Sequence, residues 1–158
     1  MNGEECIKAA RWTLEQLREG QSYSFDHVFS EEEVDKFTLI SGDQSPIHID
    51  ETFARQRGYE GRVIHGVLLA GLVSRLVGMH LPGQNAVLQS LTLNFVMPAY
   101  IGDAVELRAR IDQISLATRT IVLKFEIAHK QQDRLLARGK AQIGLTTESS
   151  DKNRTSSL

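Results

Sequence analysis

The feature of this sequence that most constrains its fold is one apolar helix followed by a long series of alternating segments. From Gly66 to about His80, the segment GVLLAGLVSRLVGMH is apolar almost all round, and Pro82 and Gly83 end it. A helix with apolar residues on every side is typical of a protein interior. We therefore expect this helix to be buried.

The chain after this helix changes to a period of two. Apolar residues alternate with polar ones in four runs, which predicts antiparallel strands with one face in water. One helix can shield the apolar face of such a sheet if the sheet curves around it. The sequence therefore predicts an α+β fold, with a single sheet wrapped on a central helix. The alternating apolar positions are Leu91, Leu93 and Phe95; Val105, Leu107, Ala109 and Ile111; Ile121, Leu123, Phe125 and Ile127; and Ala141, Ile143 and Leu145.

The part before the central helix carries clear local signals. Ser30 and Glu33 have the spacing of a capping box, which predicts a helix that begins there and ends at Gly42. Asp50 can cap a short helix that follows. Residues 22–29 alternate loosely and are interpreted as an edge strand.

We expect one domain with an extension at each end. Apolar residues fall roughly on one side of residues 6–19, which predicts a helix, so residues 1–20 are interpreted as an N-terminal helical extension. Residues 21–146 are expected to form the wrapped-sheet domain. Residues 147–158 are polar and have no period, which predicts a disordered tail.

Composition and charge exclude several classes of function. The 158 residues carry a formal net charge of -2, which provides no general attraction to nucleic acid or to an anionic membrane. No targeting segment is visible, and Ser74 and Arg75 interrupt the longest apolar block before membrane-spanning length. The single cysteine, Cys6, cannot make an internal disulfide and fits a reducing compartment. We expect a soluble, cytoplasmic protein without a nucleic-acid or membrane partner.

The stretch SGDQSPIHID places an acid and a histidine on either side of a proline. Pro46 fixes its own φ and pushes Ser45 toward extended geometry, so a kinked loop can turn Asp43 and His48 toward one point. A carboxylate and an imidazole that share a water molecule can act on it as base and acid. In the alternative interpretation, Asp43 caps the next helical turn and His48 is an ordinary loop histidine. The spacing alone favours that alternative.

Three residues in the apolar helix or directly before it need a separate interpretation. The backbone N–H of Gly66 would lie at the positive end of the helix dipole and could polarise a carbonyl oxygen, unless the glycine serves packing alone. A buried hydroxyl at Ser74 would bond the carbonyl one turn back, or else a substrate. His65 is interpreted as a structural residue that is bonded to backbone.

The sequence offers no motif for a cofactor. It contains no phosphate-cradling glycine loop and no nucleophile elbow. Neither a metal nor another cofactor is expected, because the remaining histidines have no metal-ligand spacing among themselves or with Cys6. These histidines are His27, His80 and His129.

Three blocks of the chain resemble the MaoC-like (R)-specific enoyl-CoA hydratases. The blocks read SGDQSPIHIDETFA, GRVIHGVLLAGLVSRLVG and LPGQNAVLQSLTLNFVMPAYIGDAVELRARI, and the similarity runs from about Gln21 to Leu145. The family motif Asp-x-Asn-Pro-x-His reads DQSPIH over residues 43–48, with Ser45 at the asparagine position. The resemblance implies the hot-dog fold, in which an antiparallel sheet wraps a long helix.

The resemblance also implies a reaction and a role for each residue. Such an enzyme hydrates trans-2-enoyl thioesters reversibly to (R)-3-hydroxyacyl thioesters and needs no cofactor. Asp43 would draw a proton from water, while His48 would orient the water and help to deliver a proton. The Gly66 amide would hold the thioester oxygen, and Ser74 would line the same site. The substrate would be an acyl-CoA or an acyl carrier protein thioester, and the chain would form a homodimer or higher homo-oligomer.

Two other functions stay open from the sequence. A hot-dog domain can be an acyl-CoA thioesterase, or it can be a non-catalytic subunit that binds acyl thioesters. The intact pair of Asp43 and His48 favours the hydratase. The acyl chain length, the carrier, the direction of the reaction and the residues that hold the CoA phosphates stay open as well. Leu69, Val73 and Val77 are the residues we expect to line the acyl pocket.

Overall fold

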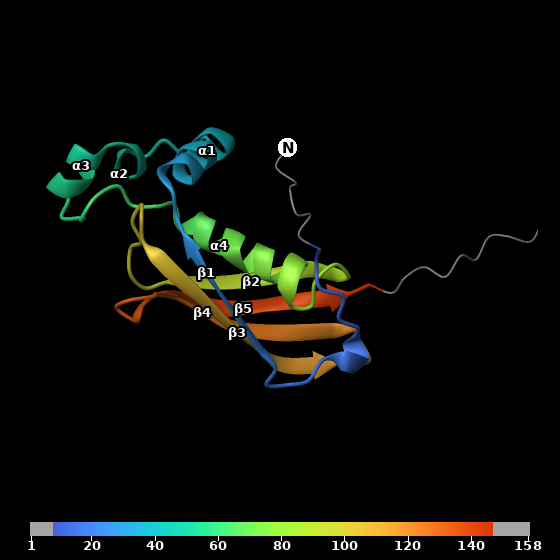
Figure 1. Cartoon of the computed structure of the whole chain (residues 1–158). Helices are drawn as coiled ribbons and strands as arrows, with labels where there is room; N and C mark the ends of the chain where they lie inside the picture. Colours follow the sequence, from blue (N-terminus) through green and yellow to red (C-terminus); the bar gives the residue numbers. More distant parts are fainter. Residues whose placement is uncertain (1–7, 147–158) are drawn as a thin grey trace, which may run out of the picture.

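A five-stranded antiparallel sheet wraps around one side of a central helix (Figure 1). This computed structural model describes residues 8–146, so the predicted tail lies outside the described residues. The elements are η1 (Leu14–Gln16), β1 (Ser22–Val28), α1 (Glu31–Ser41), α2 (Pro46–Ile49), α3 (Glu51–Gln56), α4 (Gly66–Arg75), the π-helical turn η2 (Leu76–His80), β2 (Ala86–Phe95), β3 (Ala104–Ser115), β4 (Thr120–His129) and β5 (Arg134–Leu145). The strand order is β1-β3-β4-β5-β2, so β1 and β2 form the two edges. Within the described part of the chain, no helix is both long and apolar enough to cross a membrane.

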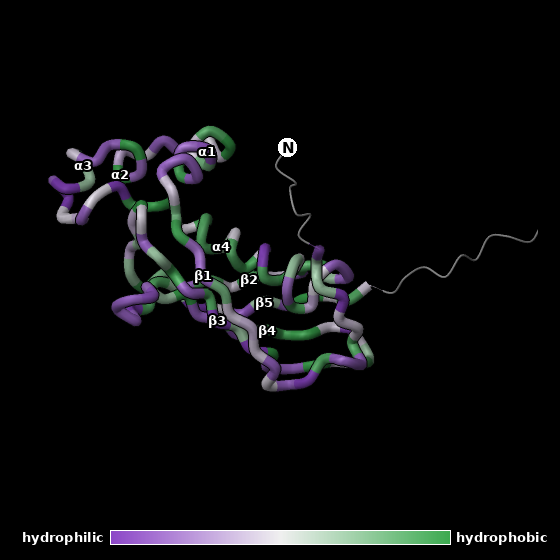
Figure 2. The backbone as a smooth tube through the Cα atoms, viewed as in Figure 1, coloured by the Kyte–Doolittle hydropathy of each residue, from purple (hydrophilic) through white to green (hydrophobic). Residues whose placement is uncertain are grey.

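The core lies between α4 and the inner face of the sheet. Leu69, Leu72 and Val73 of α4 are buried and belong to one cluster with the inward-facing residues of the strands. Figure 2 shows α4 as mainly hydrophobic and α3 as mainly hydrophilic. The strands alternate between buried and exposed residues along β3 and β4, as the period of two predicts. The α+β arrangement expected from the sequence is confirmed.

The prediction that α4 is buried on every side is wrong. Val67, Gly71 and Ser74 are exposed, and their spacing of four and three residues places them on one side of the helix. We call these three residues the open stripe of α4. The side chain of Val67 is 60% exposed. One sheet covers only one side of a helix, and no other element of the described residues buries the opposite side. The hydroxyl of Ser74 is therefore not a buried group.

The segment before β1 is not the helix predicted over residues 6–19. In its described part it forms one short 3₁₀ turn, Leu14–Gln16. The N–H of Ala10 donates to the carbonyl oxygen of Met79 at 2.8 Å, which ties the segment to the chain that follows α4. The side chain of Leu14 is buried in the core. This path needs a largely extended chain, so tertiary contacts outweigh the local helical pattern.

The local signals for α1 and α3 predicted both helices correctly. The Ser30 hydroxyl accepts a hydrogen bond from the Glu33 N–H, and the Glu33 carboxylate accepts one from the Ser30 N–H. Gly42 has a φ of 72°, a left-handed conformation that ends α1. The side chain of Asp50 caps α3 by accepting from the N–H of Phe53 at 2.9 Å. The helices α1, α2 and α3 lie together beyond the end of the sheet where α4 begins (Figure 1).

Candidate active site

Asp43 lies in the loop that follows α1. The N–H of Ser45 donates to Oδ1 of Asp43 at 3.1 Å, and the N–H of Asp43 donates to the hydroxyl of Ser41 at the same distance. These contacts anchor one oxygen of the carboxylate in a local turn. The side chain is 52% exposed. Its Oδ2 is therefore the oxygen that can serve another partner.

His48 lies in α2, which begins at Pro46. A proline in the first helical position loses no helical hydrogen bond, and its fixed φ favours the start of the helix. Nδ1 of His48 lies 2.7 Å from the carbonyl oxygen of Val63. Because a carbonyl oxygen can only accept, Nδ1 carries the hydrogen and Nε2 presents a lone pair. Nε2 lies 3.9 Å from Oδ2 of Asp43.

This separation brings two hydrogen-bond acceptors to one place. A distance of 3.9 Å is too long for a direct hydrogen bond, but one oxygen atom can lie within hydrogen-bond distance of both groups. Water suits two adjacent acceptors because it has two hydrogens to donate. The alternative interpretation, in which Asp43 caps the next helical turn, accounts for the bond to Oδ1 but gives no role to Oδ2. The pair can therefore hold a water molecule and take a proton from it.

Gly66 is the first residue of α4. The first N–H groups of a helix have no partner within the helix and lie at the positive end of its dipole. A Cβ atom at this position would lie 2.8 Å from the ring of Phe95. Glycine is therefore the residue that fits here without a shift of that ring.

His48 and Gly66 line the same cleft, which has a volume of about 360 Å³. Leu69 of α4 and Phe95 at the end of β2 form apolar walls of this cleft. The chain thus places a polar group and a helix N-terminus beside an apolar space, as a site for an acyl thioester requires. The other lining residues are Tyr59, Val63, Ile64, Val96, Met97, Pro98 and Ala99.

Three residues that were expected to contact the substrate lie elsewhere. Ser74 belongs to the open stripe of α4 and is not part of the cleft lining. Val73 and Val77 are 0% and 3% exposed, and both are packed in the core. Leu69 alone among the expected acyl-pocket residues lines the cleft.

The sequence pattern does not reveal the ring contact of His65 or the contacts of Arg62. His65 is 2% exposed, and its Nε2 donates to the carbonyl oxygen of Asp43 at 2.9 Å, which confirms that it is bonded to backbone. Its ring also stacks on His48, with ring centroids 3.9 Å apart. Arg62 donates to the carbonyl oxygen of His48 at 2.7 Å and pairs with two carboxylates of α1. The only sequence signal for either residue is its position shortly before Gly66.

Asp43, His48 and His65 also offer three potential metal-ligand atoms within 4.8 Å of one another. Nε2 of His65 carries the hydrogen that it donates to the Asp43 carbonyl, so that nitrogen has no free lone pair. A metal ion bound there would have to break this hydrogen bond. The two acceptors Oδ2 of Asp43 and Nε2 of His48 offer a water molecule partners without the loss of this hydrogen bond.

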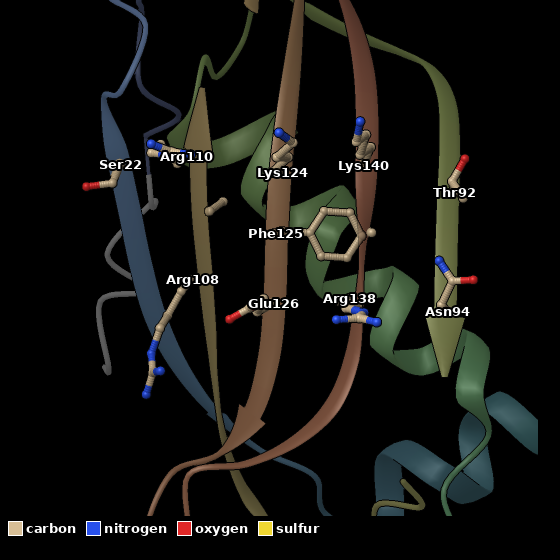
Figure 3. A pocket seen from close by; sticks show the side chains of 12 residues that line it. Ser22, Thr92, Asn94, Arg108, Arg110, Lys124, Phe125, Glu126, Arg138 and Lys140 are labelled. Carbon is tan, nitrogen blue, oxygen red and sulfur yellow. The ribbon is translucent and has the colours of Figure 1, made fainter. Parts of the chain in front are cut away.

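A larger hollow lies on the outer face of the sheet, with α4 behind the strands (Figure 3). It has a volume of about 610 Å³ and is lined by charged side chains of neighbouring strands. Several of these charges are already paired, since Arg108 contacts Glu106 at 2.8 Å and Lys124 contacts Asp112 at 2.7 Å. The hollow contains none of the candidate site residues. The candidate residues His48 and Gly66 line the smaller cleft instead.

Comparison with known proteins identifies the family and agrees with this fold. The model of the family described as "MaoC like domain" matches residues 15–131. A 3-hydroxybutyryl-CoA dehydratase of Methylorubrum extorquens is 39% identical over 101 residues, which are 64% of this chain and 64% of the relative. An (R)-specific enoyl-CoA hydratase of Rhodospirillum rubrum is 37% identical over 92 residues, which are 58% of this chain and 64% of the relative. The chain thus spans slightly less than two thirds of the length of these two relatives.

A solved structure supports the same grouping. The (R)-hydratase from A. caviae involved in PHA biosynthesis is 31% identical in sequence and superposes with a TM-score of 0.78. The match covers 82% of this chain and 98% of that chain. The expected hot-dog fold, an antiparallel sheet wrapped around a central helix, is confirmed.

Proposed function

This chain belongs to the MaoC-like domain family, and on that premise we propose that it is an (R)-specific enoyl-CoA hydratase. It would add water reversibly to trans-2-enoyl thioesters and form (R)-3-hydroxyacyl thioesters. The observation that carries the proposal is the 3.9 Å separation between Oδ2 of Asp43 and Nε2 of His48. His48 lines the cleft together with Gly66, whereas Asp43 lies beside His48 and is not one of the lining residues. The names of the two curated relatives and of the solved structure support the same class of reaction.

In the proposed reaction, a single water molecule donates one of its two hydrogens to Asp43 and its second hydrogen to His48. The water oxygen attacks C3 of the enoyl thioester while Oδ2 of Asp43 takes a proton, and His48 keeps the oxygen oriented and assists the transfer. The proton is then delivered to C2, so one water molecule has been added and both side chains return to their starting state. Acid–base catalysis of this kind contributes about 10²–10⁴-fold in rate. The reverse path dehydrates a 3-hydroxyacyl thioester.

The Gly66 N–H is the proposed donor to the thioester oxygen. Negative charge develops on that oxygen as C3 is attacked, and a donor at a helix N-terminus stabilises it. Gly66 has no side chain, so a substrate oxygen can approach its amide. The neighbouring apolar walls of Leu69 and Phe95 would accommodate the acyl chain.

We further propose that the chain acts as a homodimer joined at β2. This edge strand is ten residues long, and its Val87 and Phe95 are 50% and 56% exposed. Long open edges of this kind are normally covered, since their free N–H and C=O groups would otherwise recruit other chains. A second copy at this edge would also lie near the open stripe of α4. Ser74, the remaining residue with an expected substrate contact, would then face that copy.

The test is a hydration assay on the purified chain with trans-2-enoyl-CoA substrates of increasing acyl length. Loss of the conjugated enoyl signal, with an (R)-3-hydroxyacyl-CoA product identified by chiral chromatography, is the expected result. A parallel thiol assay detects release of free CoA, which would indicate a thioesterase instead. Binding of the thioester without any turnover would indicate a non-catalytic subunit. The preferred acyl length would be obtained from the same series.

A further inference from the structure

Residues 62–65 lie beside Asp43 and His48, the proposed catalytic pair, and make several contacts with them and with Ile47. We call these residues the clamp segment. Its contacts come from both backbone and side chains. They reach the loop that carries Asp43 and the helix α2 that carries His48, so the positions of both depend on one short stretch of chain. The contacts are Arg62 Nε to the His48 carbonyl at 2.7 Å, His48 Nδ1 to the Val63 carbonyl at 2.7 Å, the Val63 N–H to the Ile47 carbonyl at 3.0 Å, and His65 Nε2 to the Asp43 carbonyl at 2.9 Å.

His65 is the member of the clamp segment that contacts both catalytic residues. Its Nε2–H holds the backbone of Asp43, and its ring lies on the ring of His48 with an interplanar angle of 26°. It is 2% exposed, so solvent does not compete for these contacts. The chain continues directly from His65 to the Gly66 amide. The buried side chain of His65 thus contacts both Asp43 and His48, and its backbone is bonded directly to Gly66, the proposed oxyanion donor.

We propose that His65 is a positioning residue for the hydration reaction, which acts by fixing Asp43 through its hydrogen bond and His48 through its stacked ring. This inference rests on the proposed function. The side chain of Asp43 is half exposed, and its remaining described hydrogen bonds are short-range contacts to Ser41 and Ser45. Without His65, the loop that carries Asp43 would lose the hydrogen bond that joins its backbone to a buried side chain. Displacement of a catalytic group by about 1 Å costs on the order of 100-fold in rate.

A second observation separates positioning from packing. Nδ1 of His65 is buried and has no hydrogen-bond partner among residues 8–146. A buried polar atom without a partner lowers stability. An apolar ring would fill the same space without that cost, so packing alone does not account for a histidine here. The hydrogen bond from Nε2 to Asp43 does account for it.

Two variants separate the hydrogen bond from the ring. His65→Phe keeps an aromatic ring beside His48 but removes the donor, whereas His65→Gln keeps a donor of similar reach and removes the ring. His129→Phe is the matched control, because His129 is also a buried histidine, at 7% exposure, and lies outside the cleft. For each variant, kcat and KM are measured and normalised to the folded fraction from thermal unfolding.

We expect His65→Phe to lower kcat by up to about 100-fold, with a KM within about threefold of wild type because ground-state binding is unchanged. His65→Gln should recover part of this loss, and His129→Phe should keep the wild-type kcat per folded molecule. Combining His65→Phe with Asp43→Asn should cost little more than Asp43→Asn alone, since His65 acts through Asp43. A wild-type kcat in folded His65→Phe, or fully multiplicative losses when His65→Phe is combined with Asp43→Asn, would each overturn the proposal.

Histidine NMR provides a readout that does not depend on turnover. In the wild type we expect the His48 ring to carry its hydrogen on Nδ1 and to show a ring-current shift from His65, and in His65→Gln we expect that shift to be lost. If the wild type hydrates no enoyl thioester, the proposed function fails and the NMR result alone decides the positioning. Unchanged His48 resonances in both His65 variants would then overturn it, and shifted resonances would support it.

Discussion

Oδ2 of Asp43 and Nε2 of His48 lie 3.9 Å apart and are both available as hydrogen-bond acceptors. Oδ1 of the same carboxylate is held by the Ser45 N–H, and Nδ1 of the same imidazole is held by the Val63 carbonyl. Each side chain is thus anchored by one atom and directs its other atom to a common point. Two groups that serve one water molecule form a single functional unit. Their contributions to the rate should therefore not be independent.

The first prediction tests this unit. Asp43→Asn and His48→Gln keep the approximate size of each side chain, so both variants should fold. Each should lose about 10²–10⁴-fold in the rate of enoyl-CoA hydration. The double variant should be little worse than the poorer single variant, because the shared water is already inactive. Steady-state kinetics of all four proteins provides the comparison. Losses that multiply, or wild-type turnover in a single variant, would contradict a shared water.

The second prediction isolates the Gly66 N–H. Gly66→Ala adds a Cβ 2.8 Å from the Phe95 ring but keeps the amide hydrogen, whereas Gly66→Pro also removes that hydrogen. Proline is tolerated at the first helical position, and His65 already has the extended backbone that a following proline requires, with φ -61° and ψ 126°. Gly66→Pro should be slower than Gly66→Ala by about 10²–10³-fold in kcat, the cost of one lost oxyanion donor.

The Ala variant serves as the control for the added carbon atoms. Thermal unfolding of both variants shows whether they are folded to the same extent. Equal kcat values in folded Gly66→Ala and Gly66→Pro would exclude this amide from the mechanism.

The third prediction concerns the second copy of the chain. Wild-type protein at micromolar concentration should give a dimer mass by light scattering. Val87→Glu on the β2 edge, or Val67→Glu on the open stripe of α4, should shift the mass toward the monomer because each buries a charge in the proposed interface. Leu116→Glu is the control, since Leu116 is 69% exposed and lies after the end of β3. A wild-type monomer would refute the proposed dimer, and a shift in the control alone would place the interface elsewhere.

The fourth prediction concerns the stability of the fold at low pH. His80 stacks on Tyr23 with ring centroids 4.7 Å apart, and its Nε2 has no hydrogen-bond partner among the described residues. Burial lowers the pKa of His80 below its usual value of 6.5, and the nearby positive charge of Arg75 lowers the pKa further. The folded state thus favours the neutral ring more than the unfolded state does. This contribution to stability is complete above pH 6.5 and is lost as the pH falls from 6.5 through the folded-state pKa.

His80→Phe removes this titration and keeps an aromatic ring beside Tyr23. Denaturant unfolding of both proteins at about pH 8 and about pH 5.5 isolates the effect of this residue, since the other titrating groups are common to both. The free energy of unfolding of the wild type should fall relative to that of the variant at the lower pH. A difference between the two proteins that stays constant with pH would contradict the lowered pKa of His80.

The sequence by itself determined the helices and strands that depend on interactions between residues close together in the chain. Ser30 and Glu33 cap α1 through groups three residues apart, Gly42 ends it, and the alternation of the strands follows from the period of the backbone. Such features depend on neighbouring residues, so they are visible in a linear pattern. The loop around Pro46 made a common point for Asp43 and His48 possible, but the spacing alone favoured two separate local roles, and only the structure places Oδ2 and Nε2 3.9 Å apart.

Only the tertiary structure decided the features that depend on contacts between distant residues. His65 reaches back 22 positions to the carbonyl of Asp43, and no periodicity or motif marks that bond. The described segment before β1 forms only the short 3₁₀ turn Leu14–Gln16 because its backbone bonds to the chain beyond α4, although its own pattern favours a helix. Ser74 is exposed because one sheet covers one side of α4, whereas hydrophobicity alone predicted burial on all sides. Burial and long-range hydrogen bonds arise from the packing of whole elements, which the local sequence does not encode.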